Sequence, residues 1–203
     1  MSNIDFNEDI RDGIQEVTNV AVGEAADKIA RSFSTFVNIP IPSVHLLEAV
    51  DLRMALSAIE SSERVTAVTQ PFFGSGISGE ALLMFTDASM GELSQLMGYQ
   101  TSIGDDHQQI ELVLEMASLL NGSCIHGICS QLDISVLLKH PTLLGQHTSL
   151  NDILSNSEFP WNQTLAIELN YAFEDYSITC DLIILFHEGS LDSMFRQVNF
   201  LLD

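Results

Sequence analysis

The stretch Asp12-Gly-Ile-Gln-Glu16-Val-Thr-Asn19-Val-Ala-Val-Gly23 carries most of the information about the fold of this chain. Its polar or bare positions, Asp12, Glu16, Asn19 and Gly23, have spacings of 4, 3 and 4, which place them in one narrow stripe of an α-helix. The apolar residues around them recur at helical spacing on another side of the same helix. We therefore predict a long helix over about residues 9–36 whose polar stripe faces solvent.

The same pattern returns 99 positions later in the chain. Asp12, Glu16, Asn19, Gly23 and Pro42 are matched in turn by Glu111, Glu115, Ser118, Gly122 and Pro141. The same offset carries Ala67-Val68 onto Ala166-Ile167 and Ser78 onto Ser177. One fixed offset over several separated positions predicts a duplicated unit, with a second long helix over about residues 105–132.

The remaining elements are predicted in a similar order in the two halves. In the first half they are a strand over 37–47, a helix over 50–59, strands over 64–73 and 80–85 around a turn at 74–76, and a helix over 89–97. In the second half they are a strand over 134–138, an irregular stretch over 145–163, strands over 164–173 and 178–186, and a helix over 191–202. Each half alone has too few strands to cover its helices. We therefore expect one domain over residues 1–203, made of two similar halves, about 9–98 and 105–203, that share one sheet.

The composition limits the kind of partner that this protein can have. Its 203 residues include 28 Asp and Glu but only 7 Lys and Arg, for a net charge of −21, and 46% of them are apolar. That apolar fraction is enough for a core, whereas so few basic residues form no patch for nucleic acid or for an anionic membrane surface. The sequence shows neither a membrane-spanning run nor a signal peptide. We expect a soluble, cytoplasmic protein.

The cysteines and histidines do not form the pattern of a disulfide, redox or metal site. Three cysteines, Cys124, Cys129 and Cys180, are an odd number among apolar neighbours, which favours small core residues over a disulfide framework or a redox function. The compact group Cys124, His126 and Cys129 points to different sides of a helix, so we expect no metal site there. No phosphate-binding glycine loop and no local context for a catalytic serine is present.

The polar stripe has two interpretations. A solvated helix surface explains a single stripe of this kind. Glycine inside a helix costs about 0.5–1 kcal/mol relative to alanine, so Gly23 and Gly122 need a reason, which is either close helix packing or the approach of a partner surface. The duplication of the whole stripe, each with a proline at the same distance, favours a function.

The residues of the first stripe resemble a known motif. Asp or Ser, three residues, Glu, two residues, Asn, about 22 residues and Pro is the pattern of the CheC-type chemotaxis phosphatases, a group that includes CheX and the flagellar-switch protein FliY. Asp12, Glu16, Asn19 and Pro42 match it fully. The resemblance covers essentially the whole chain, because length, element order and duplication are all similar to those of a stand-alone CheC.

The resemblance implies an α/β (α+β) fold of pseudo-twofold symmetry, with one continuous, mainly antiparallel sheet and two long helices side by side on one face. It also implies a phosphatase that acts on phosphorylated CheY, a response regulator that brings its own Mg²⁺, so that no cofactor belongs to this chain. Asn19 would orient the attacking water, since a carboxamide both accepts and donates hydrogen bonds. Glu16 would pair with the regulator's lysine, Asp12 would make a rim contact, and Gly23 would let the partner backbone approach.

The second stripe departs from the motif. Ser118 stands where the motif has Asn, and its hydroxyl is shorter and has no separate amide donor. Glu111 is a longer acid than the usual Asp or Ser, while Glu115 is retained and Gly122 stays bare. Asn121 lies about 60° around the helix from Ser118 and is a poor substitute. We expect a degenerate second site that is weak or silent.

Two other functions were considered. The first is a binding module that sequesters a phosphorylated regulator, or regulates a CheD-type deamidase, without turnover. The second is a structural part of the flagellar switch, like FliY, which carries an additional switch domain for which this sequence has no room. The intact Asn19 favours the enzyme, and a monomer is expected.

Overall fold

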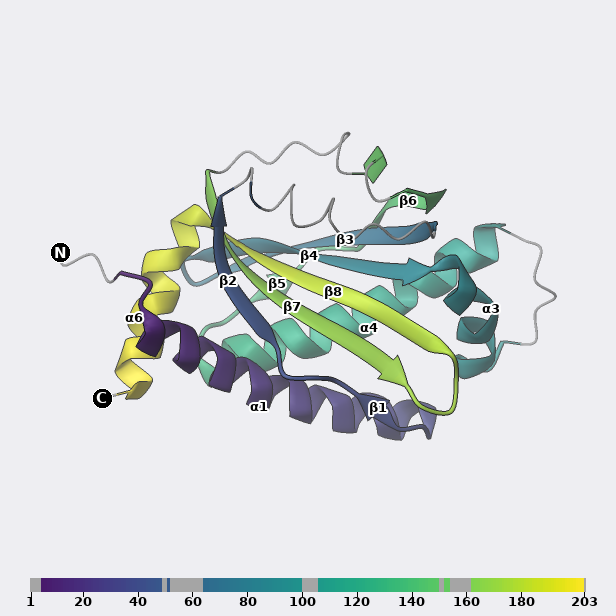
Figure 1. Ribbon diagram of the computed structural model, residues 1–203, viewed down its shortest axis with the longest axis horizontal. Coiled ribbons are helices and arrows are strands. Elements are labelled where there is room, and N and C mark those ends of the chain that lie inside the picture. The colour runs from purple at the N-terminus through teal and green to yellow at the C-terminus, as the bar shows by residue number, and fades with distance from the viewer. Residues whose placement is uncertain are drawn as a thin grey trace.

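The computed structural model describes residues 5–48, 51, 64–99, 106–149, 152–153 and 162–202. Its elements follow one another along the chain as α1 (Glu8–Phe33), β1 (Val37–Asn38), β2 (Ser43–Glu48), β3 (Val65–Gly74), β4 (Ile77–Thr86), α3 (Asp87–Leu96), α4 (Asp106–Gln131), β5 (Leu137–Leu138), β6 (Thr142–Thr148), β7 (Gln163–Phe173), β8 (Ile178–His187), the 3₁₀ turn η1 (Glu188–Ser190) and α6 (Leu191–Leu202). Figure 1 shows a twisted sheet with α6 at one end and α3 at the other. The expected mixed fold with a large, mainly antiparallel sheet is confirmed.

The sheet has eight strands in the order β1-β7-β8-β4-β3-β5, with β2 also paired to β7 and β6 also paired to β3. Among the described strands every pairing is antiparallel. The hairpins β3–β4 and β7–β8 meet in the middle, where β4 pairs with β8. A pseudo-twofold arrangement of two hairpins therefore forms the centre of the molecule.

The outer strands are exchanged between the halves. β2 of the first half pairs with β7 of the second, with Ser43 opposite Glu168. β6 of the second half pairs with β3 of the first, with Thr142 opposite Thr69. Both pairs of positions differ by 99, so the two exchanges are equivalent. Each hairpin is thus completed only by strands from the other half.

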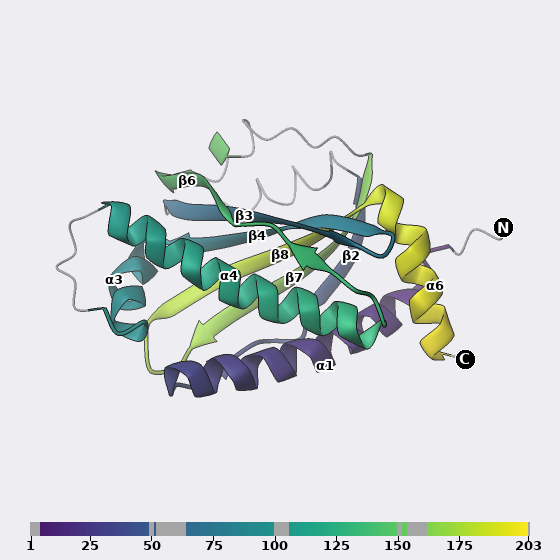
Figure 2. The same ribbon diagram turned by 180° about the vertical axis from the view of Figure 1, so that it is seen from behind.

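The long helices α1 and α4 lie beside each other along one face of the sheet (Figure 2), as expected. They approach closely where a methyl group on Gly127 of α4 would come within 3.0 Å of the Cβ of Ala21 on α1. One apolar core joins both helices to the sheet and includes Ile14, Met116 and Tyr171, all fully buried. Burial of this face fixes the opposite sides of α1 and α4 toward solvent.

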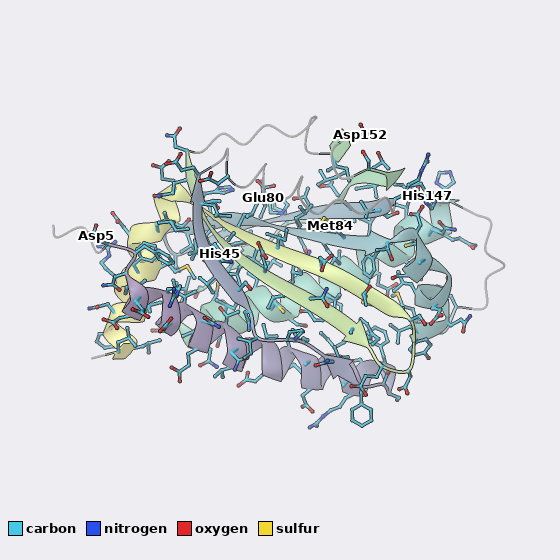
Figure 3. The ribbon with its side chains drawn as sticks, viewed as in Figure 1. Asp5, His45, Glu80, Met84, His147 and Asp152 are labelled. Atoms are coloured by element: carbon cyan, nitrogen blue, oxygen red, sulfur yellow. The ribbon has the colours of Figure 1, made fainter. Side chains whose placement is uncertain are left out.

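A smaller apolar cluster lies on the other face of the sheet. It includes Leu82 and Met84 of β4 and Ile153. Glu80 is on the same side of β4, because side chains alternate along a strand, and Figure 3 shows it with Met84 away from the long helices. Hydrogen bonds from His187 and from Thr69 hold the pKa of the Glu80 carboxyl below its usual value, against the opposing effect of burial.

Helix α4 is more apolar than we expected of any segment. Between residues 107 and 131 it has the length and the mean hydropathy, 1.4, of a helix that could cross a bilayer. More than half of its most apolar window, 56%, is buried inside the protein, and its exposed side carries Glu111, Glu115 and Ser118. The core helix of a soluble protein has the same composition, so α4 is a helix of the core.

Most predicted elements agree with the structure to within about three residues, and the exceptions have a local cause. The strand predicted over 37–47 is divided into β1 and β2, because Pro40 and Pro42 have no N–H for a ladder. The predicted strand over 134–138 forms only β5. The helix predicted over 50–59 lies outside the described residues except for its position 51.

The prediction of an irregular stretch over residues 145–163 was wrong in its first part. Residues 142–148 form β6, an edge strand on β3. Its residues are mostly half-exposed, and its register on β3 shifts twice between Val65 and Val68. A strand with neither a buried face nor a regular register gives no alternating apolar pattern, so periodicity could not detect it.

The repeat offset changes inside the hairpins. β3 pairs with β4 so that Val65 lies opposite Thr86, and β7 pairs with β8 so that Thr164 lies opposite His187. The first members differ by 164 − 65 = 99 positions and the second members by 187 − 86 = 101. The second half therefore contains two more residues between its strands.

Those two residues lie in the hairpin loop. Residues 75–76 connect the last pair of β3 and β4, whereas residues 174–177 connect the last pair of β7 and β8. Ser78 consequently corresponds to Thr179, and the predicted match of Ser78 with Ser177 is wrong. A fixed offset could not reveal the longer second loop.

The corrected offset identifies two equivalent serines that connect the halves. Ser190 Oγ donates to the carbonyl oxygen of Ser78 and accepts from its N–H, both at 2.8 Å. Ser89 Oγ makes the same two bonds to the backbone of Thr179, at 3.2 and 3.3 Å. Both serines are 1% exposed, and 190 − 89 is again 101. Each serine follows one hairpin and binds the other half's strand.

Replacing Ser190 is expected to destabilise the whole fold. Ser190→Ala leaves the part-buried N–H and C=O of Ser78 without their partner, which costs about 1–3 kcal/mol of the free energy of unfolding. Urea denaturation measures this loss. Ser130→Ala, at an exposed serine on α4, is the matched control and should change stability by less than about 0.5 kcal/mol. Equal midpoints for the two variants would contradict the assigned role.

Candidate functional site

The first stripe lies on the solvent side of α1. Asp12, Glu16, Asn19 and Gly23 are all exposed, whereas the opposite side of the helix is buried in the core. The helix begins with a side-chain cap, in which Asn7 Oδ1 accepts from the N–H of Ile10 at 2.9 Å. The cap and the buried side fix the rotation of α1, and with it the direction of the stripe.

The acids of the first stripe differ in their partners. Arg11 Nη2 lies 2.9 Å from Asp12 Oδ1 and 3.6 Å from Glu8 Oε1, so the charge of Asp12 is paired. Within the described part of the chain, the side chains of Glu16 and Asn19 make no hydrogen bond or ion pair. The stripe therefore offers a free carboxylate and, one turn later, a free carboxamide.

Gly23 is not required by internal packing. A methyl group at this position would meet no atom within 4 Å, and the same holds for Gly122 in the second stripe. Gly13, by contrast, faces the core, where a methyl group would lie 2.7 Å from Cγ1 of Val198. Of the two reasons considered for a glycine, close helix packing thus applies to Gly13 and not to Gly23.

A small hollow adjoins the first stripe between α1 and the end of α6. It has a volume of about 230 Å³ and is lined by Gly13, Glu16, Val17, Val20, Gln131, Val198, Leu201 and Leu202. Three of these apolar side chains, Val20, Leu201 and Leu202, are about half exposed. The hollow is mostly apolar with one carboxylate in its lining. It could not be predicted from the sequence, because α6 is far from α1 in the chain.

The second stripe lies on α4 in the equivalent place. Glu111, Glu115 and Ser118 are exposed and Gly122 is half-buried. Asn121 is fully buried, and its Nδ2 donates to Oε1 of Gln70 on β3 at 3.1 Å. The nearby amide is thus committed to the core and does not reach the stripe.

Glu115 has a partner that the sequence did not reveal. Tyr99, just after α3, donates its hydroxyl to Oε2 of Glu115 at 3.1 Å. This hydrogen bond, followed by the charge of Glu115, raises the pKa of the Tyr99 hydroxyl, and the charge of Glu111 adds to the effect. The two acids of the second stripe therefore both act on Tyr99.

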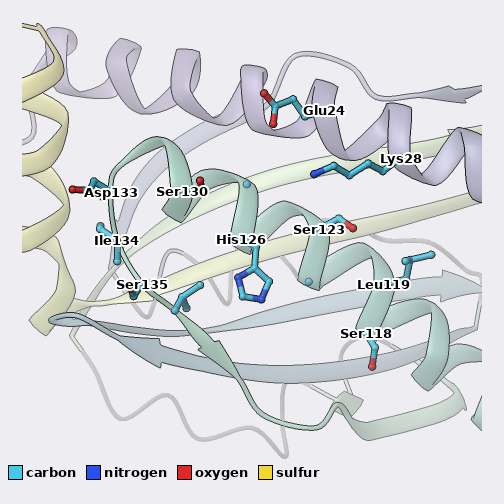
Figure 4. A pocket seen from close by; sticks show the side chains of 13 residues that line it. Glu24, Lys28, Ser118, Leu119, Ser123, His126, Ser130, Asp133, Ile134 and Ser135 are labelled. Carbon is cyan, nitrogen blue, oxygen red and sulfur yellow. The ribbon is translucent and has the colours of Figure 1, made fainter.

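An open, polar groove of about 790 Å³ runs between the helices (Figure 4). α1 contributes Glu24 and Lys28 to it, and α4 contributes Ser118, Ser123 and His126. The groove thus extends from the position after Gly23 to the second stripe. Over the described ranges, no three His, Cys, Asp or Glu side chains gather as metal ligands.

The cysteines are part of the core, as predicted. Cys124, Cys129 and Cys180 are free and buried, and burial raises the pKa of the Cys124 and Cys129 thiols to about 12. Such thiols stay protonated and unreactive at neutral pH. His126 is exposed on the other side of α4, so the group Cys124, His126 and Cys129 does not converge.

Comparison with known proteins gives matches in structure alone. No protein-family model and no curated protein sequence matches the chain. FliY of Thermotoga maritima aligns with 97% of this chain and 98% of its own, at 16% identity and a TM-score of 0.70. FliM of H. pylori, crystallised in a complex with SpeE, aligns with 96% and 97%, at 10% identity and a TM-score of 0.62. A CheC-like chemotactic protein of Shewanella oneidensis MR-1 aligns with 83% and 96%, at 12% identity and a TM-score of 0.56.

These likenesses show a shared fold. The fold expected from the resemblance to CheC and FliY is confirmed over nearly the whole chain. The same fold occurs in FliM, which the solved structure contains as a binding partner of another protein. The shared fold does not identify the chemistry of this chain, which depends on its own residues.

Proposed function

We propose that this protein, which has the fold of FliY and of CheC-like proteins, hydrolyses the aspartyl phosphate of a CheY-type response regulator. The observation that carries the proposal is the exposed stripe on α1. There the carboxylate of Glu16 and the carboxamide of Asn19 are both without partners within the described residues, and Gly23 leaves the next turn bare. A helix face of this kind can enter the active site of another protein.

Hydrolysis of an aspartyl phosphate needs few catalytic groups from the enzyme. An aspartyl phosphate is already a reactive acyl phosphate, so the missing requirement is a water molecule held in line for attack. The carboxamide of Asn19 can accept from this water and donate to a neighbouring group, and it has no charge to repel the phosphoryl group. The regulator supplies the Mg²⁺ and the lysine that neutralise charge on the phosphoryl oxygens. Asn19 thus acts as the group that orients the water.

Glu16 is proposed to bind the regulator's lysine. Since its carboxylate makes no internal bond in the described chain, no existing contact has to be broken when the lysine arrives. A charge-assisted contact of this kind fixes orientation and register. Asp12 is already paired with Arg11, which suits a contact at the rim. We propose that this protein acts as a monomer and that it binds the regulator in the cytoplasm.

A second candidate function is a binding module without turnover. The observation that favours it is the shared fold with FliM, which was crystallised in a complex. In this alternative the α1 stripe captures a phosphorylated regulator, or the protein regulates a CheD-type deamidase. The two functions differ in their need for Asn19, because capture requires complementarity and not a positioned water.

Phosphate release at substoichiometric protein separates the two functions. Purified protein is added at one hundredth of the concentration of a phosphorylated CheY-type regulator, and inorganic phosphate is measured. The enzyme is expected to release many phosphates per molecule. Binding of a beryllofluoride-loaded regulator without accelerated release would establish the binding module instead.

Gly23→Ala is expected to separate stability from activity. The change should raise the free energy of unfolding by about 0.5–1 kcal/mol, because alanine is the better helix former and its methyl group meets no atom. It should lower kcat/KM by about tenfold if the partner backbone approaches this turn. Gly122→Ala is the matched control: it should gain the same stability and leave kcat/KM unchanged. Equal activities of the two variants would remove Gly23 from the interface.

A further inference from the structure

The two stripes differ in what covers their acids. On α4, the hydroxyl of Tyr99 is bonded to Glu115 at 3.1 Å and lies within the field of Glu111. On α1, Glu16 lines an open hollow. We propose that Tyr99 closes the second stripe to the regulator and so limits the protein to one docking face. This inference rests on the proposed function, since it concerns the same partner.

The end of helix α3 fixes the position of Tyr99. The N–H of Gly98 donates to the carbonyl of Gln95 at 3.0 Å, and the N–H of Tyr99 donates to that of Ser94 at 2.9 Å. Gly98 has a φ of +75°. These two bonds around a left-handed glycine form a Schellman motif. The backbone of Tyr99 is therefore held by the cap, and its side chain is directed at the second stripe.

The internal repeat provides a comparison within the same molecule. Ser89 and Ser190 establish an offset of 101 for the helices after the hairpins, and the same offset carries Tyr99 onto Phe200. Phe200 has no hydroxyl, lies within the continuing helix α6, and is 76% exposed. The aromatic residue that engages the acid on α4 thus has a counterpart that leaves Glu16 free on α1.

Two separate defects therefore keep the second stripe silent. The first is Ser118, which lacks the carboxamide. The second is Tyr99, because a regulator's lysine can reach Glu115 only after the hydrogen bond from Tyr99 is broken and its ring is moved. Because the hydrogen bond from Tyr99 to Glu115 is exposed, water competes for both groups, and its loss corresponds to about 2- to 10-fold in an equilibrium constant. Restoring the carboxamide by Ser118→Asn alone should thus not be sufficient to activate the second stripe.

The test counts binding sites with a beryllofluoride-loaded, Mg²⁺-bound CheY-type regulator by titration calorimetry. Wild type is expected to bind one regulator per chain, and Tyr99→Ala two, with the second site tightened by about 2- to 10-fold. Tyr99→Phe, which removes only the hydroxyl, should give an intermediate second site and serves as the variant that preserves the ring. One regulator per chain in all three proteins, or two in wild type, would overturn the inference. No binding to wild type would overturn the proposed function and this inference with it.

Phosphate release gives a second readout in a background where the first stripe is disabled. In Asn19→Ala protein, adding Ser118→Asn alone should leave the rate within about twofold, whereas adding Ser118→Asn together with Tyr99→Ala should raise it by about tenfold or more. Equal recovery with and without Tyr99→Ala would show that Ser118 is the sole defect and would overturn the inference.

Discussion

Asn19→Ala is expected to lower the rate of phosphate release from a phosphorylated CheY-type regulator by about 100- to 1,000-fold, the effect of removing one preorganised polar group from an active site. The side chain of Asn19 is exposed and makes no hydrogen bond in the described chain, so its removal should leave stability nearly unchanged. Binding of the beryllofluoride-loaded regulator should also persist. The loss should thus appear in kcat with little change in KM.

Matched variants separate the amide from the shape of the side chain. Asn19→Asp keeps the size but introduces a charge that repels the phosphoryl group and removes the N–H donor, so it should be as inactive as Asn19→Ala. Ser118→Ala, at the equivalent position of α4, should retain full activity. Full activity in Asn19→Ala, or a loss in Ser118→Ala that equals it, would exclude the proposed role of Asn19.

The long helices and the direction of their stripes could be predicted because a helix has a short, regular period. Residues at spacings of 3 and 4 report directly on one side of the helix, so the exposure of Asp12, Glu16 and Asn19 needed no knowledge of the sheet. The same rule placed Asn121 away from Ser118, and the structure finds Asn121 in the core. Local geometry was sufficient for these features.

Features that depend on distant pairing could not be predicted in this way. The exchange of β2 and β6 between the halves cannot be detected in the sequence of either strand. Backbone hydrogen bonds between strands form in the same way whichever half supplies the partner strand. The two additional residues in the second hairpin loop shifted the equivalence of Ser78. Ser89 and Ser190 were overlooked for the same reason, since an offset of 99 does not align them.

The environment of the site was equally inaccessible from the sequence. Tyr99 lies 16 positions before Glu115, and only the Schellman motif at the end of α3 brings its hydroxyl to that carboxylate. The hollow beside Glu16 depends on α6, which begins at Leu191, 158 positions after α1 ends at Phe33. The motif could identify which residues face solvent, but not what lies next to them.

Separating the two halves is expected to abolish folding altogether. A fragment of residues 1–99 retains the hairpin β3–β4 but loses β8, β5 and β6 from its sheet, and its own β1 and β2 lose their partner β7. Helix α1 loses α4, and Ser89 loses the backbone of Thr179. The fragment of residues 105–203 suffers the equivalent losses. The whole free energy of unfolding of a domain is only about 5–15 kcal/mol, which leaves little margin for such losses, so neither fragment should show a cooperative transition in urea.

A circular permutant distinguishes lost contacts from the chain break itself. The permutant begins at residue 106, passes through a flexible linker from residue 202 to residue 5, and ends at residue 99. The first turns of α1 lie against the end of α6, where a methyl group on Gly13 would be 3.4 Å from a methyl carbon of Leu202, so a linker of modest length can join these ends. The permutant keeps every exchanged strand and both serine contacts, and it should unfold cooperatively. Because the halves complete each other's hairpins, we also expect the two fragments to regain a cooperative transition when they are mixed. A folded, monomeric fragment of either half would show that the domain is divisible and that the exchanged strands are dispensable.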